Sequence, residues 1–170
     1  HESETPPNCH ATVVTTPDGV YTLNPNTGVV SYTNTDGTAG TKAGITYQVT
    51  DSFGLTASAR LTPNIPTQPT AAIDISVGQQ GSIQQISPTS NDSPGDTSAP
   101  LVPTSIRLCN ATETPMSCNS TTVVNSAGTY VVQPDGTISF TPISATYSGT
   151  APAVPYVIRD SLGQATSSTI

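Results

Sequence analysis

The 170-residue chain is poor in charged residues, which make up 9% of it, and 4 Lys and Arg against 11 Asp and Glu give a net charge of −7. An acidic chain without basic clusters cannot neutralise phosphates, which argues against nucleic acids and anionic membrane surfaces as partners. No apolar stretch approaches the ~20 residues of a membrane-spanning helix, so we expect no membrane insertion. Because neither Met nor a signal peptide opens the chain, we expect His1 to lie inside a longer precursor.

The 16 Pro, 13 Gly and abundant Ser and Thr are also typical of disordered segments. Against disorder, the net charge is modest and the large apolar residues fall in short alternating runs, as half-buried strands require. No comparable run has helical spacing. The composition and pattern together predict an all-β fold.

Residues 1–65 recur farther along the chain. An offset of 109 positions, as between Cys9 and Cys118, aligns two series of residues. The first series is Cys9, Gly19, Tyr21, Pro25, Gly40, Thr41, Tyr47, Asp51, Ser52 and Gly54, and the second is Cys118, Gly128, Tyr130, Pro134, Gly149, Thr150, Tyr156, Asp160, Ser161 and Gly163. This internal repeat predicts two domains. Residues 1–65 are the C-terminal part of one β-sandwich repeat, and residues 66–170 are a nearly complete second one.

The segment 63–69 joins the two copies and contains Pro63, Pro66 and Pro69. Proline-rich linkers adopt extended, semi-rigid conformations. We therefore expect a joint that resists collapse.

The front of the second copy has no counterpart in the first. It contains the strands predicted at Ala71–Val77, Ser82–Ser87 and Ser105–Cys109. A sandwich without those strands leaves an apolar face and an open sheet edge in water, which folded proteins avoid. Either the first copy is cut, or another chain supplies the strands by augmentation, and we favour the first interpretation.

The loop between the second and third of these predicted strands contains Asn91, Asp92 and Asp96. Oxygen ligands in a glycine-containing loop bind hard cations, which makes these residues calcium candidates. The same residue types also cap turns through their own backbone, and we favour that structural role. We expect no other cofactor.

Cys109 and Cys118 are nine positions apart and flank a loop that contains Thr and Pro. They are close enough to form a disulfide if the two strand ends return toward each other, and a disulfide implies an oxidising, extracytoplasmic location. The counterpart of Cys109 falls just before His1, so we expect Cys9 to have lost its partner by truncation. The alternative is a metal or catalytic role, which needs convergent ligands, and only His1 and His10 accompany the cysteines.

Two hairpins follow in the second copy. The first joins the alternating runs Gly128–Gln133 and Thr137–Thr141 through a Pro-Asp-Gly turn. The second begins with the alternating run from Val154 to Ile158 and turns at Asp160–Gly163, and the first copy repeats that turn at Asp51–Gly54. Seven or eight short strands in about 105 residues match an immunoglobulin-like sandwich.

No catalytic constellation emerges, and we predict that the chain is not an enzyme. A serine nucleophile needs a base held by a third group, and neither histidine supplies one. A glycosidase needs two carboxylates in a cleft, whereas the acidic residues here lie mostly at turn positions. The one lysine is Lys42, whose counterpart is Ala151, so a recurring isopeptide bond is not expected.

A longer set of residues carries a family resemblance through its order and spacing. These are Asn91-Asp92, the run Pro100–Leu108, Gly128-Thr129-Tyr130, the turn at Pro134, Phe140-Thr141-Pro142, Gly149-Thr150-Ala151, and Tyr156 with Asp160, Ser161 and Gly163. In these features the chain resembles the CshA-type fibril repeat of bacterial cell-surface adhesins. The resemblance implies tandem immunoglobulin-like β-sandwich repeats that form an extracellular stalk and project a binding region from the cell wall. The cysteine pair departs from it, and so does Tyr32-Thr33-Asn34, which replaces Phe-Thr-Pro.

We therefore expect a structural stalk repeat whose partners are neighbouring repeats of the same polypeptide or fibre, with host protein or glycan bound elsewhere. Two alternatives stay open. One is a binding module that grips a glycan or protein through loops such as Ser87–Pro100, although few aromatic residues remain free for a glycan platform. The other is a filament subunit completed by strand exchange between chains.

Overall fold

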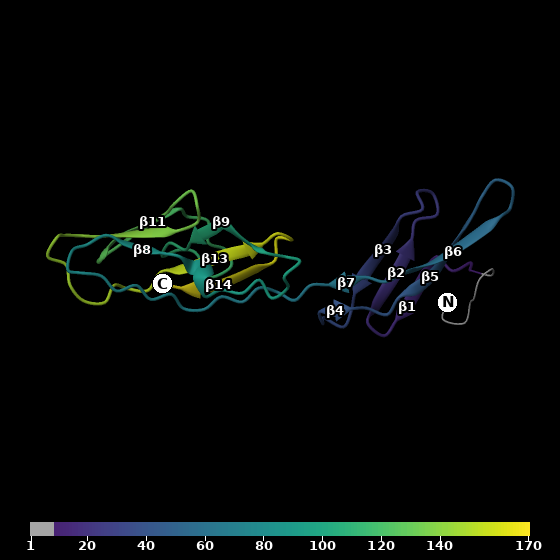
Figure 1. The fold of residues 1–170 in the computed structure, drawn as a ribbon, viewed down its shortest axis with the longest axis horizontal. Coiled ribbons are helices and arrows are strands. Elements are labelled where there is room, and N and C mark those ends of the chain that lie inside the picture. The colour runs from purple at the N-terminus through teal and green to yellow at the C-terminus, as the bar shows by residue number, and fades with distance from the viewer. Residues whose placement is uncertain (1–8) are drawn as a thin grey trace. The chain divides into compact units, whose positions relative to one another are not determined.

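The computed structural model of the protein describes residues 9–170 (Figure 1). Strands dominate it, and a single turn of 3-10 helix, η1 at Pro88–Ser90, accompanies them in the described residues. The chain divides into two compact units, His1–Pro66 and Thr67–Ile170. No helix in the part of the chain that the structure describes is long and apolar enough to cross a membrane.

The described part of the first unit, residues 9–66, contains three small sheets. Its strands are β1 (Val13–Thr16), β2 (Gly19–Leu23), β3 (Val30–Asn34), β4 (Gly40–Thr41), β5 (Ile45–Thr50), β6 (Thr56–Leu61) and β7 (Asn64–Ile65). One sheet has the order β1-β2-β3, and β4 with β7 and β5 with β6 form two further pairs. All of these pairings are antiparallel.

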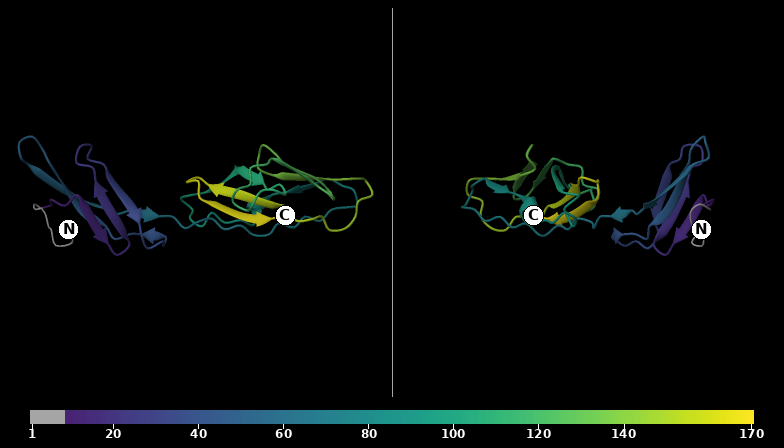
Figure 2. Two further views of the ribbon diagram at one scale, coloured as in Figure 1. Left: turned by 180° about the vertical axis from the view of Figure 1, so that it is seen from behind. Right: turned by 45° about the vertical axis from the view of Figure 1, so that its right-hand side comes forward.

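The second unit contains two larger sheets. Its strands are β8 (Gln84–Ile86), β9 (Leu101–Leu108), β10 (Thr122–Asn125), β11 (Gly128–Val132), β12 (Ile138–Pro142), β13 (Pro155–Asp160) and β14 (Ala165–Thr169). The sheet orders are β10-β11-β12-β8 and β14-β13-β9. Each sheet therefore ends on a strand, β8 or β9, that comes from the front of the repeat. Figure 2 shows the two sheets from behind and from an oblique side.

The core of the second unit lies between its two sheets and draws on both. It consists of the buried side chains of Ile86, Ile106, Leu108, Ala127, Tyr130, Ile138, Phe140, Val154, Tyr156 and Ile158. Along each strand these residues recur at every second position, because alternate side chains of a β-strand point to the same face of the sheet. The predicted all-β, immunoglobulin-like sandwich is confirmed by this arrangement.

The first predicted hairpin is present as β11 and β12. Tyr130 lies opposite Phe140 in the register, and their ring centroids are 4.6 Å apart. The turn is closed by a hydrogen bond from the backbone N–H of Gly136 to the carbonyl of Gln133, 3.0 Å long. Gly136 has a φ of +87°, a conformation that glycine adopts without a Cβ penalty.

The second predicted hairpin is present as β13 and β14, and the aspartate that opens its turn caps the backbone. Asp160 Oδ1 accepts hydrogen bonds from the N–H groups of Leu162 and Gln164, at 3.0 and 2.8 Å. In the first unit Asp51 Oδ1 accepts equivalent bonds from Phe53 and Leu55, at 2.9 and 2.8 Å. Both units thus build this turn from the same side-chain contact.

The aromatic pair at the centre of each unit is duplicated as well. Tyr21 lies opposite Tyr32 across β2 and β3, with ring centroids 4.8 Å apart. These residues are the counterparts of Tyr130 and Phe140. The internal repeat of the sequence is therefore also a repeat of packing.

The prediction of a strand at Ala71–Val77 is wrong, because the structure has no strand there. The segment is extended, but its phase is opposite to that expected from its apolar residues. Ile75 and Val77 are 84% and 92% exposed, whereas Asp74 is buried. Asp74 also donates its backbone N–H to the carbonyl of Thr169 in β14, at 2.9 Å. The buried Asp74 side chain lies near the polar groups of Tyr156 and Asn91, which lower its pKa in opposition to burial.

The other two predicted front strands exist with different bounds. The strand expected at Ser82–Ser87 is limited to β8, which pairs with β12. The strand expected at Ser105–Cys109 is β9, which begins earlier, at Leu101, and pairs with β13 through an irregular register. Pro103 is tolerated within β9 because that strand is at the sheet edge, where a missing N–H costs no ladder bond.

Candidate functional site

The segment that enters the second unit, residues 70–74, is held by a short stretch of the loop between β8 and β9. Thr70 and Ser93 exchange two backbone hydrogen bonds, each 2.9 Å long. The Asn91 side-chain amide donates to the carbonyl of Ile73 at 3.0 Å, and Asp92 Oδ1 accepts from the N–H of Ala72 at 2.9 Å. We call residues 70–74, together with Asn91, Asp92 and Tyr156, the entry anchor.

Tyr156 connects this anchor to the centre of the sandwich. The residue belongs to β13 and is completely buried. Its hydroxyl lies 3.0 Å and 3.1 Å from the two carboxylate oxygens of Asp92, and 3.3 Å from the carbonyl of Ala72. A buried hydroxyl that is hydrogen-bonded to a carboxylate is among the stronger neutral-to-charged contacts in proteins. The anchor therefore joins the entering chain to a core strand.

The electrostatics of the anchor follow from its burial. Removal from water raises the pKa of Asp92, an effect that the hydrogen bonds from Ala72 and Tyr156 oppose. Burial likewise raises the pKa of Asp74, with a further increase from the nearby charge of Asp92. Asp74 Oδ2 has no hydrogen-bond partner in the described structure. The pKa of Tyr156 is raised by burial and by both carboxylates, so it stays a hydrogen-bond donor.

The entering segment of the second unit also lies beside the last strand of that unit, β14. The entering segment and β14 run in the same direction along the unit (Figure 1), and the bond from Asp74 to Thr169 joins them. The contacts of the anchor must break before the entering segment separates from the body of the unit.

The structure joins Cys109 and Cys118 in a disulfide with a Cα–Cα distance of 4.3 Å. The bond closes the loop between β9 and β10, and both cysteines pack with Val157 and Ala165 in a small buried cluster. Within the loop the Glu113 carboxylate accepts backbone hydrogen bonds from Asn110 and Asn119, at 2.9 and 3.1 Å. Cys9 is a free cysteine. His1 lies outside the described residues.

The three calcium candidates have separate protein partners. Asn91 and Asp92 hold the entering segment, as described above. Asp96 Oδ1 accepts from the N–H and hydroxyl of Ser98 at 2.8 and 2.7 Å, and these bonds lower the pKa of Asp96. No group of three or more His, Cys, Asp or Glu side chains suited to a metal ion occurs among residues 9–170. Calcium binding stays a prediction of the sequence.

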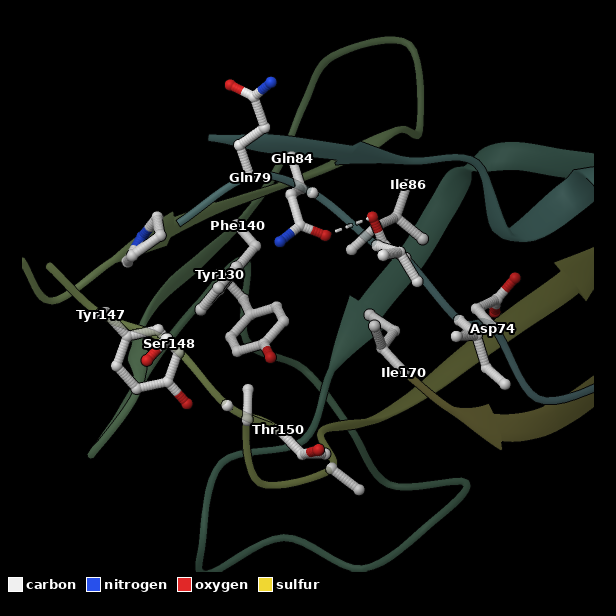
Figure 3. Close-up of a pocket in the computed structure, with 18 of the residues that line it drawn as sticks. Asp74, Gln79, Gln84, Ile86, Tyr130, Phe140, Tyr147, Ser148, Thr150 and Ile170 are labelled. Atoms are coloured by element: carbon white, nitrogen blue, oxygen red, sulfur yellow. Dashed lines mark hydrogen bonds between the residues drawn. The ribbon is translucent and has the colours of Figure 1, made fainter. Parts of the chain in front are cut away.

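A cavity of about 540 Å³ opens at one end of the second unit. Tyr130, Phe140 and Tyr147 contribute to its wall, with Tyr147 on one side and Asp74 on the other (Figure 3). Tyr130 and Phe140 are buried core residues, so they show the cavity little of their ring faces. A glycan platform needs exposed aromatic faces, and this cavity supplies few of them.

An ion pair that the sequence did not suggest lies in the first unit. Lys42 follows β4 outside any strand and is buried, and its Nζ lies 3.0 Å from Asp36 Oδ1 and 2.7 Å from Thr38 Oγ1. The backbone N–H of Thr38 and then Lys42 lower the pKa of Asp36 to about 2. No sequence signal marks this pair, since its members are six positions apart in an irregular segment. Asp74 was missed likewise, because it stands between two isoleucines in a run rich in apolar residues.

Two family models match the chain, one over each unit. No curated protein and no solved structure matches the chain. A family model described as a bacterial Ig domain matches residues 4–64. A second model, described as the surface adhesin CshA repetitive domain, matches residues 66–170, which is more than half of the chain. The chain therefore belongs to the family of CshA-type surface adhesin repeats.

Proposed function

We propose that this chain is a non-enzymatic stalk segment of a fibrillar adhesin, which extends a binding region from the bacterial surface and resists tension. The observation that carries the proposal is the entry anchor. Its hydrogen bonds hold the segment through which the chain enters the second unit, and a hydroxyl of a core strand completes it. Neighbouring repeats of the same polypeptide are the partners of such a segment.

Two features support a mechanical role outside the cell. The disulfide suits an oxidising compartment. It also limits how far the second unit extends when it unfolds, because the residues between Cys109 and Cys118 stay closed in a loop. A chain of that length spans about 3 nm when it is extended.

The binding-module alternative receives less support. The loop Ser87–Pro100 was its main candidate for contact with a glycan or protein. Asn91 and Asp92 of that loop instead hold the chain's own entering segment, and Asp96 caps its own turn. The loop therefore has a structural use that explains its polar residues.

Single-molecule stretching of the whole chain tests the proposal. We expect Tyr156→Phe, which removes the anchoring hydroxyl, to lower the unfolding force of the second unit. Tyr147→Phe is the matched control, because in the described structure the Tyr147 hydroxyl makes no hydrogen bond and its loss leaves the force unchanged. Under reducing conditions the extension per unfolding event lengthens by about 3 nm. Equal unfolding forces for the Tyr156→Phe variant and the unchanged chain would contradict the proposed role of the anchor.

A further inference from the structure

The first unit has an open apolar face where the second unit has a closed core. A cavity of about 930 Å³ lies there, lined by Tyr21, Leu23, Val30, Ile45, Tyr47 and Leu61 among others. Tyr47 is 40% exposed and Val49 is 56% exposed, whereas their counterparts Tyr156 and Ile158 are both 0% exposed. Equivalent positions of the two copies thus differ in what covers them.

The second unit shows which segment provides this cover. In it, β8 pairs with the outer edge of β12, and β9 pairs with the outer edge of β13. These two strands contribute Ile86, Ile106 and Leu108 to the core. The counterparts of β12 and β13 are β3 and β5, and no strand of residues 9–170 pairs with the outer edge of either.

Two further groups in the first unit lack a partner that their counterparts have. Gln48 is the counterpart of Val157, which packs against the disulfide, and Gln48 Oε1 is buried without a hydrogen bond. Cys9 is the counterpart of Cys118 and is a free cysteine that borders the cavity. In the second unit the neighbour at the equivalent positions is β9, which is followed directly by Cys109.

We propose that the open face of the first unit is the docking site for the front half of a repeat of this type, joined to the N-terminal side of the unit. The occupant is a polypeptide with the pattern of residues 67–109. It pairs one strand with β3 and another with β5, places three large aliphatic side chains in the cavity, and presents a cysteine to Cys9. Oxidation of the two thiols by an external oxidant, such as molecular oxygen or a disulfide, forms the bond and releases two protons and two electrons to that oxidant.

The test extends the whole chain by a second copy of residues 67–109 placed directly before His1. We expect the Cys9 thiol to become resistant to alkylation, and mass mapping to show a disulfide between Cys9 and Cys109 of the added copy. We also expect the backbone amides of β3 and β5 to exchange hydrogen at least about tenfold more slowly than in the unextended chain.

Three variants of the extended chain separate docking from other causes. Cys9→Ser keeps the slow amide exchange, because strand pairing does not need the disulfide. Replacing Ile86, Ile106 and Leu108 of the added copy with serine abolishes the slow amide exchange. The matched control replaces the exposed Gln85 and Thr104 of that copy with alanine and preserves the slow exchange.

Other outcomes overturn the proposal. If the backbone amides of β3 and β5 exchange hydrogen at the same rate in the extended and the unextended chain, a front half is excluded as the occupant. Dimerisation of the unextended chain with protection of β3 would identify a second copy as the occupant instead. The stretching experiment on Tyr156 reports on the second unit, so its outcome and this one are independent.

Discussion

The hairpins β5–β6 and β13–β14 have the same register and the same turn but different surroundings. Tyr47 lies opposite Ala59, and Tyr156 lies opposite Ser168, which are the equivalent positions. Only the second hairpin is covered by β9 and by the entry anchor. The hairpin therefore forms from local sequence, while the burial of its side chains depends on a segment far away in the chain.

Truncation of the equivalent tyrosines should give the largest contrast. We expect Tyr156→Ala to destabilise the second unit by about 3–5 kcal/mol, because a completely buried aromatic side chain leaves a cavity. We expect Tyr47→Ala to cost less than about 1 kcal/mol, because its side chain is already partly in water. Hydrogen exchange followed by mass spectrometry on peptides from each unit measures both. Similar costs at the two positions would show that the two tyrosines have similar cover.

Removal of the disulfide should have the next largest effect and should act on one unit. Replacing Cys109 and Cys118 with serine is expected to destabilise the second unit by about 2–3 kcal/mol, since the short loop is no longer closed in the unfolded state. Cys9→Ser is the control and should leave the stability of both units unchanged. Urea unfolding, with and without reductant, provides the measurement. An effect of reductant on the double-serine variant would refute this explanation.

Acid should distinguish the two units because, among residues 9–170, carboxyl groups with a raised pKa occur in the second unit only. In the first unit the pKa values of Asp18 and Asp36 are both lowered, so the stability they provide is present above pH 3.8 and is lost as the pH falls through their folded-state values, to about 2 for Asp36. In the second unit the pKa values of Asp96 and Asp135 are lowered as well, but those of Asp74 and Asp92 are raised. Protonation of Asp74 and Asp92 as the pH falls toward 3.8 therefore favours the folded state and offsets the loss at the other two. Amide hydrogen exchange measured at decreasing pH should therefore show that the first unit unfolds at a higher pH than the second.

Single variants check which residues cause this difference. Asp36→Asn should weaken the acid sensitivity of the first unit, because it removes the carboxyl with the stronger shift. Asp74→Asn should flatten the response of the second unit between pH 3.8 and neutrality. A first unit that resists acid as well as the second would show that other groups dominate.

The smallest effect is expected at the turns, where the two units are alike. Phe53 and Leu162 occupy equivalent turn positions and are both exposed. Phe53→Ser and Leu162→Ser should each change stability by less than about 0.5 kcal/mol. Thermal unfolding of the two variants checks this expectation. A large loss of stability in only one of the two variants would show that its turn residue makes a contact that its counterpart lacks.

Local sequence predicted most of the hairpin structure. The turns at Asp51, Pro134 and Asp160 were identified because Asp, Pro and Gly each have a specific backbone preference. The disulfide was suggested by the spacing of two cysteines. The entry anchor was not predicted, because its bonds join Ala72 to Asp92 and Tyr156 across long stretches of chain. A single residue such as Asp74 carries no local signal of these partners.

The sequence by itself determined the period of the repeat, the hairpins and their turns, because alternation and turn chemistry act over a few residues. Only the tertiary structure decided which face of segment 71–77 turns inward, how the entering chain is held, and why Tyr47 is exposed where Tyr156 is buried. Those outcomes depend on which distant strands pair at a sheet edge, and burial is a property of that assembly, not of any one strand.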